Sequence, residues 1–99
     1  MFGDLHIPID QVTIAVIDVE TTGLIAALGD RVCEIAVLRC QGGREVARFE
    51  SLVNPERPIS PGAARVNGLS DAMVRAALRF AEVLGTVEAL VQDAVLVAH

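Results

Sequence analysis

The pattern of apolar and polar positions changes near Asn54. Three β-branched, largely apolar stretches precede it and are typical of strands: residues 12–19, 31–39 and 44–53. The first is apolar except for Thr13 and Asp18, so we expect it to be buried on both faces. Residues 41–43 (QGG) predict a hairpin turn, since glycine supplies positive φ. The third stretch is more polar and is expected near the edge of an antiparallel meander.

Helical signals follow Asn54. Ser60 can cap a helix that begins at Pro61 and stops at Gly68, and Ser70 can cap a second short turn. Apolar residues at helical spacing predict an amphipathic helix over 79–92 with these residues in the core: Phe80, Val83, Leu84, Val87, Leu90 and Val91. Residues 94–98 (AVLVA) predict a short buried strand. This strand should run parallel to one already in the sheet, because a helical crossover leads into it.

The chain is therefore expected to form an α/β domain of order β-β-β-α-α-β over residues 12–99, after a leader of residues 1–11. A hydrophobic fraction of 53% is high for 99 residues, which suggests apolar faces covered by further chain or by a partner. Residues 1–11 lack the features of a signal peptide and no apolar run is long enough to span a membrane, so we expect a cytoplasmic protein. Cys33 and Cys40 stand too far apart along one strand to form a disulfide, and are expected to be reduced.

The net charge of −5 argues against a general phosphate-binding surface, which needs clustered basic residues. A bound divalent metal could supply positive charge locally instead. Asp18 and Glu20 are suited to hold one, because residues two apart in a strand point to the same face. Hard cations such as Mg²⁺ prefer carboxylate oxygens. The alternative is that the pair opens a loop in which Thr21 and Thr22 cap backbone groups.

Five segments together resemble the DEDD (DnaQ-like) exonucleases, which include the epsilon proofreading subunits of bacterial DNA polymerase III, ribonuclease T and oligoribonuclease. Residues 17–24 (IDVETTGL) resemble the first exonuclease motif, and residues 31–37 (RVCEIAV) and 52–55 (LVNP) resemble parts of the next two strands. Residues 67–71 (NGLSD) stand where relatives often carry His-Gly-Ile-Thr-Asp. Residues 96–99 (LVAH) resemble the start of the second motif.

The resemblance implies a ribonuclease-H-like mixed sheet and a catalytic site with two Mg²⁺ or Mn²⁺ ions. Asp18 and Glu20 would be metal ligands, and four residues would cradle the 3′-terminal nucleotide: Thr21, Thr22, Gly23 and Leu24. Asn67 replaces the usual His. It could bind a phosphate or sugar, or it could simply end a helix.

The implied reaction is 3′→5′ hydrolysis of terminal phosphodiester bonds of DNA, of the proofreading or repair type, releasing nucleoside 5′-monophosphates. The partner would be a single-stranded DNA 3′ end, with RNA possible. The remaining metal ligands and the general base would lie beyond His99, where a polymerase partner or a fused domain could also be joined, so residues 1–99 alone are expected to be inactive. The alternative functions are a non-catalytic nucleic-acid or protein-interaction module on the same fold, or an RNA-directed exonuclease relative.

Glu34 interrupts the apolar second strand. It could act as a hydrogen-bond acceptor near the metal site without binding the metal itself. Alternatively, it could be a structural carboxylate that accepts hydrogen bonds from the backbone or a Thr hydroxyl. Because buried charges are usually paired, the structural interpretation is favoured.

Overall fold

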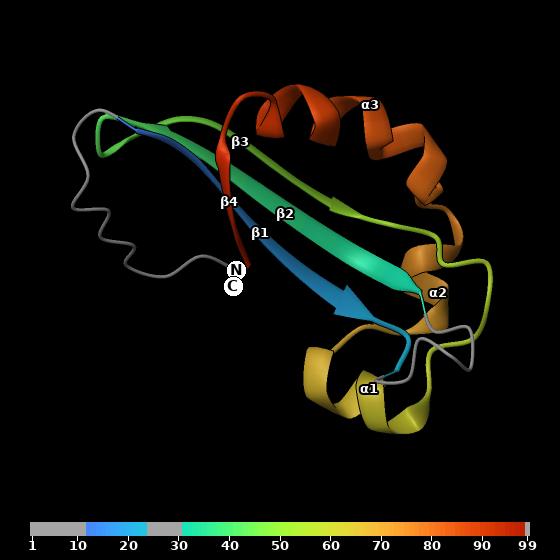
Figure 1. Cartoon of the computed structure of the whole chain (residues 1–99). Coiled ribbons are helices and arrows are strands. Elements are labelled where there is room, and N and C mark those ends of the chain that lie inside the picture. The colour runs from blue at the N-terminus through green and yellow to red at the C-terminus, as the bar shows by residue number, and fades with distance from the viewer. Residues whose placement is uncertain (1–11, 24–30, 99) are drawn as a thin grey trace.

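The computed structural model describes residues 12–23 and 31–98. One face of a four-stranded mixed sheet is covered by a helix, and two short helices lie at one end (Figure 1). The elements are β1 (Thr13–Thr21), β2 (Val32–Gln41), β3 (Arg44–Leu52), α1 (Pro61–Asn67), α2 (Asp71–Arg75), α3 (Phe80–Val91) and β4 (Val95–Ala98). The predicted order of strands and helices is confirmed. The predicted leader, residues 1–11, lies outside the described residues.

The sheet has the strand order β3-β2-β1-β4. The first three strands form the predicted antiparallel meander, and β4 pairs with β1 in parallel, as expected after a helical crossover. Gly42 and Gly43 make the turn between β2 and β3, with φ of 58° and 80°. A two-residue turn with positive φ at both positions matches the twist of the strands it joins. The more polar β3 is an edge strand, as predicted.

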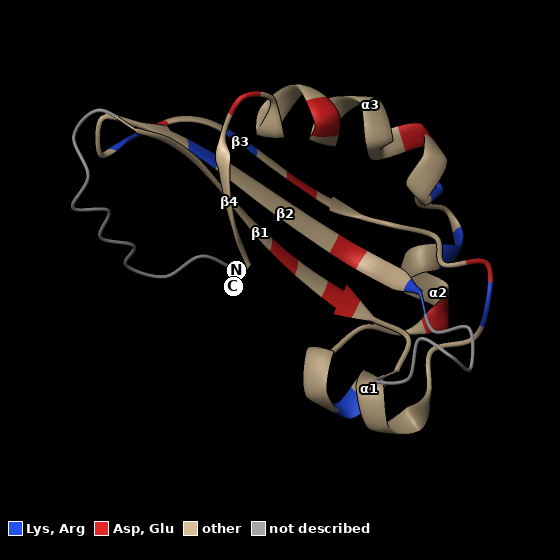
Figure 2. Ribbon diagram, viewed as in Figure 1, with Lys and Arg blue, Asp and Glu red and all other residues tan. Residues whose placement is uncertain are grey.

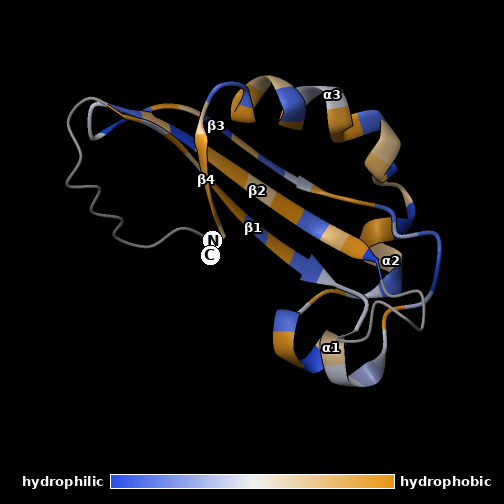
Figure 3. Ribbon diagram, viewed as in Figure 1, coloured by the Kyte–Doolittle hydropathy of each residue, from blue (hydrophilic) through white to orange (hydrophobic). Residues whose placement is uncertain are grey.

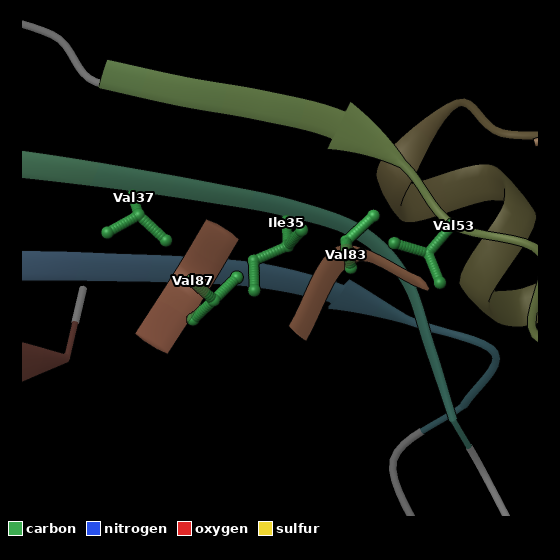
Figure 4. Packing of buried hydrophobic residues seen from close by; sticks show 5 residues of the cluster. All are labelled: Ile35, Val37, Val53, Val83 and Val87. Carbon is green, nitrogen blue, oxygen red and sulfur yellow. The ribbon is translucent and has the colours of Figure 1, made fainter. Parts of the chain in front are cut away.

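The main core lies between α3 and one face of the sheet. Val83 and Val87 of α3 pack against Ile35, Val37 and Val53, and all five side chains are buried (Figure 4). The amphipathic helix was therefore predicted correctly, and its first turn begins within a residue of the expected position.

Two residues of the predicted helical core are not in it. Phe80 is 42% exposed and Leu84 is 38% exposed. The sheet contacts a narrow stripe of α3, and these two side chains lie at its margins. Apolar spacing alone could not show how wide the covered stripe would be.

Two strand predictions were also wrong in part. β4 was expected to be buried, but Val95 and Leu96 are more than half exposed, and this strand is coloured hydrophobic throughout in Figure 3. It stands at the edge of the sheet, where no described element packs on it. In β1, burial on both faces holds for residues 14–16 but not beyond, since Val19 is 40% exposed.

The other face of the sheet divides into two regions along its strands. One carries a buried cluster of Ile14, Val16, Leu38 and Cys40. The other carries the acidic residues of β1 and β2, whose positions are red in the ribbon of Figure 2. Among the described residues, no helix has the length and apolar character that crossing a membrane requires.

Candidate metal centre

Asp18 and Glu20 lie near the C-terminal end of β1, half-buried, on the sheet face opposite α3. Their face follows from the register: Asp18 pairs with Ala36 and Glu20 with Glu34, whereas Ile17 and Ile35 point to the α3 side. The strand extends through Thr21, two residues farther than predicted. Both carboxylates are therefore anchored in a hydrogen-bonded ladder rather than in a loop.

Glu34 is the residue directly across from Glu20. Burial raises the pKa of the Glu34 carboxyl, and the negative charge of Glu20 raises it further. Within residues 12–23 and 31–98, no group donates a hydrogen bond to this carboxylate. Among these described residues, the favoured interpretation of Glu34 as a satisfied structural carboxylate therefore finds no donor to support it. Its side chain instead adds a third negative charge beside the pair on β1.

A β-bulge separates this acidic region from the end of the ladder. Glu20 pairs with Glu34 but Thr21 pairs with Val32, so Cys33 is an extra residue on β2. Cys33 is fully buried in a third cluster, which it forms with Ile59, Leu69 and Val74. Burial raises the pKa of its thiol, and the charges of the neighbouring glutamates raise it further. The bulge thus places this buried apolar cluster, which includes residues of α1 and α2, next to the carboxylates.

Thr22 is fully buried just beyond the strand. Its backbone N–H donates to the Arg31 carbonyl (2.8 Å), and its hydroxyl accepts from the Arg31 N–H (3.0 Å). The Thr21 hydroxyl donates to the Gly23 carbonyl. Thr22 therefore does cap a backbone group, as the alternative interpretation proposed, and in this structure any effect of its side chain on a nucleotide would be indirect. Leu24 lies outside the described residues.

Helix α1 is attached to this segment at both of its ends. At one end, the Ser60 N–H donates to the Thr22 carbonyl (2.9 Å). At the other, the Asn67 side-chain amide donates to the Thr21 carbonyl (3.2 Å) and accepts from the Leu69 N–H (3.0 Å). Both helix caps were predicted, with Ser60 and Gly68 in their expected roles. The bonds to Thr21 and Thr22 were missed, and only the capping signals near 60 and 67 pointed to this part of the chain.

The carboxylates of Asp18 and Glu20 provide some, but not all, of the ligands that a hard divalent cation needs. Mg²⁺ commonly takes one or two carboxylates and completes its shell with water and phosphate oxygens. Asp18 and Glu20 supply two such carboxylates from one strand face. The described part of the chain contains no group of three or more His, Cys, Asp or Glu placed to hold a metal. These residues can therefore form one side of a metal centre, and a pair of ions would need further ligands.

A groove of about 590 Å³ lies on the other side of the β1 terminus, and sequence reasoning missed it. Its described lining is Thr21, Arg31, Val32, Asn54, Pro55, Glu56, Arg79, Phe80 and Ala81. Glu56 pairs with Arg31 and with Arg79, each at 3.6 Å. Both guanidinium groups are exposed and already paired with Glu56.

Comparison with known sequences identifies related proteins. The family model described as exonuclease, of the RNase T type, matches residues 15–99. A DNA polymerase III subunit epsilon-like protein of Rhodobacter capsulatus is 45% identical over 94 residues, covering 93% of this chain and 13% of the relative. A PolC-type DNA polymerase III of Bacillus cereus is 38% identical over 98 residues, covering 99% of this chain and 7% of the relative. The chain thus spans only a small part of the curated relatives it matches.

Solved structures show the same fold. Escherichia coli exonuclease I in complex with a dT13 oligonucleotide superposes with a TM-score of 0.76 at 22% identity, covering 90% of this chain and 20% of that one. Exonuclease X in complex with 5′ overhanging duplex DNA gives a TM-score of 0.65 at 32% identity, covering 75% of this chain and 42% of that one. The ribonuclease-H-like mixed sheet expected from the sequence is confirmed.

Proposed function

The chain belongs to the DEDD-type (DnaQ-like) exonuclease superfamily, and on that premise we propose that it contributes half of a two-metal site for 3′→5′ hydrolysis of DNA. One observation carries the proposal. Asp18 and Glu20 lie on one face at the end of a central strand, held there by the ladder with β2. Two carboxylates that share one strand face are the oxygen ligands that a hard divalent cation prefers.

In this proposal Asp18 and Glu20 hold Mg²⁺ or Mn²⁺. When bound, such ions would supply the charge that activates a water molecule and stabilises the leaving oxygen of the phosphodiester. The carboxylates contribute by fixing where the positive charge lies relative to the scissile phosphate. Thr21, Gly23 and Leu24 follow directly in the chain and would orient the terminal nucleotide. Thr22 would act indirectly, since its hydrogen bonds with the Arg31 backbone hold residues 21–23 in place.

The proposed substrate is the 3′ end of single-stranded DNA, and the proposed product is a nucleoside 5′-monophosphate. The DNA polymerase III relatives and the DNA-bound neighbours support DNA over RNA, and they support proofreading or repair beside a polymerase. A cytoplasmic location belongs to the same proposal. The chain spans 13% or less of the relatives named above, so the remaining metal ligands and the general base are also part of what is proposed.

The test uses the protein expressed from its full open reading frame and a single-stranded oligonucleotide labelled at its 5′ end. With Mg²⁺ we expect a ladder of products shortened stepwise from the 3′ end, with nucleoside 5′-monophosphates released. Asp18→Asn and Glu20→Gln should each lower the rate at least about a hundredfold, as expected for loss of a charge used in the transition state. Glu88→Gln, an exposed glutamate of α3, is the matched control.

Three outcomes would count against the proposal. Shortening from the 5′ end would reverse the polarity. Faster degradation of RNA than of DNA would favour the RNA-directed alternative. Metal-independent binding of DNA without cleavage, unchanged by Asp18→Asn, would support the interaction module instead.

A further inference from the structure

The peptide group between Thr21 and Thr22 is held from both sides. Its carbonyl accepts from the Asn67 side chain at 3.2 Å, and its N–H donates to the Arg31 carbonyl at 2.8 Å. The ladder between β1 and β2 ends at Thr21, and beyond it the bonds between Thr22 and Arg31 hold the backbone on the β2 side. Asn67 therefore binds the first peptide group beyond the end of the ladder.

The Asn67 side chain is itself fixed. Its Oδ1 accepts from the Leu69 N–H at 3.0 Å, and Leu69 is buried against Cys33 and Val74. The orientation of the amide follows from chemistry, because a backbone N–H can only donate and the Thr21 carbonyl can only accept. Gly68, at φ 72°, turns the chain so that both bonds form from one side chain. Asn67 thus links the buried cluster under the carboxylates to the segment that follows them.

We propose that Asn67 is a positioning residue that, through the Thr21 carbonyl, sets the orientation of residues 21–23, which directly follow the proposed metal ligand Glu20. The inference rests on the proposed function, and it differs from a direct contact between Asn67 and substrate. Reacting groups misplaced by about 1 Å lower rates by roughly a hundredfold, so a single hydrogen bond can matter here beyond its contribution to stability.

The chain contains a matched control. The Asn54 amide donates to the Arg75 carbonyl at 3.1 Å, and its Oδ1 accepts from the Glu56 N–H at 2.9 Å. This is the same pair of bonds as at Asn67, but it joins the 54–58 segment to α2 and involves neither Thr21 nor the carboxylates. Asn67→Ala and Asn54→Ala should therefore lower stability to a similar extent, while differing in their effect on the metal centre.

The experiment compares these two variants in the protein expressed from its full open reading frame. Three quantities are measured: the exchange rate of the Thr22 amide by NMR, the affinity for Mn²⁺ by calorimetry, and kcat and KM on single-stranded DNA. For Asn67→Ala we expect faster amide exchange, weaker Mn²⁺ binding and a kcat lowered roughly ten- to hundredfold, with little change in KM. For Asn54→Ala we expect none of the three to change. Should Asn67→Ala not fold, Asn67→Asp keeps the acceptor for Leu69 and replaces the donor to Thr21 with a charged carboxylate oxygen, so its Thr22 amide should also exchange faster.

Two results would overturn the inference while leaving the proposed function intact. Asn67→Ala could match Asn54→Ala in every readout, which would mean a purely structural role. It could instead raise KM alone, with Thr22 exchange and Mn²⁺ affinity unchanged, which would mean direct contact with substrate. A wild-type protein that neither binds Mn²⁺ nor cleaves DNA would refute the proposed function and the inference with it. In that case the amide exchange would still show whether Asn67 holds Thr21.

Discussion

Glu20 and Glu34 lie directly opposite each other in the antiparallel ladder, so two carboxylates meet across β1 and β2 at the candidate metal centre. Like charges in this arrangement destabilise a sheet. The pKa of Glu34 is raised by burial and by the charge of Glu20, which reflects the same unfavourable proximity. A cation held between the strands would relieve it, so the metal-free protein should be strained electrostatically at this point.

Glu34→Gln should therefore stabilise the metal-free protein by about 0.2–1 kcal/mol, the range measured for cross-strand pairs. The measurement is urea unfolding at pH 7 in EDTA, with Glu88→Gln as the control for loss of one exposed charge. A less stable Glu34→Gln protein would mean that the Glu34 carboxylate accepts a hydrogen bond that the structure does not show.

Arg39 of β2 should be important for attaching α3 to the sheet. Its guanidinium donates to the carbonyls of Leu90 and Gln92, both at 2.8 Å, at the end of α3 where the last carbonyls lack helical partners. Arg39→Met keeps the apolar stem but loses both bonds, and should destabilise the protein by about 2 kcal/mol. Arg44→Met, on exposed β3, should change stability by less than about 0.5 kcal/mol. Equal effects of the two substitutions in urea unfolding would contradict the assignment.

Glu82 should contribute a pH-dependent part of the stability at the start of α3. The Arg79 backbone N–H donates to its carboxylate at 2.9 Å, and this bond, followed by that from the Arg79 side chain, lowers the pKa of Glu82. A lowered folded-state pKa adds stability above the unfolded-state pKa, about 4.3, and that stability is lost as pH falls through the folded value. Wild type should thus exceed Glu82→Gln in stability at pH 7, with the difference vanishing in acid. A difference that grows on acidification would be the opposite of this prediction.

Both thiols should be unreactive in the folded protein. Cys33 and Cys40 are free and buried, and burial is the main cause of the raised pKa of each. A buried thiol with a raised pKa offers little thiolate for reaction. An aromatic disulfide reagent at pH 8 should therefore modify neither cysteine until denaturant is added, after which both should react. Rapid labelling of the native protein, or a mass lower by two hydrogens, would contradict this expectation.

The meander, the caps and α3 could be predicted because each depends on local sequence. The positive φ required at Gly42 and Gly43, and the capping side chain of Ser60, act within a few residues. The face shared by Asp18 and Glu20 also follows from strand geometry alone. These features establish the fold class and half of the candidate site.

The remaining features depend on contacts between distant residues. Asn67 and Thr21 are 46 positions apart, and no spacing rule links an amide at a helix end to that carbonyl. The pairing of Glu34 with Glu20 depends on register, and a single bulge at Cys33 changes which residues meet beyond it. Exposure of β4 depends on what packs around the strand, and an apolar run alone does not reveal that.

The central claim, that Asp18 and Glu20 form part of a metal site, is tested most directly by Mn²⁺ binding to the protein expressed from its full open reading frame. Calorimetry with wild type, Asp18→Asn, Glu20→Gln and the control Glu88→Gln measures this without requiring turnover. We predict that wild type and Glu88→Gln bind Mn²⁺ alike, and that Asp18→Asn and Glu20→Gln each weaken binding at least about tenfold. Identical isotherms for all four proteins would show that these carboxylates do not hold the metal.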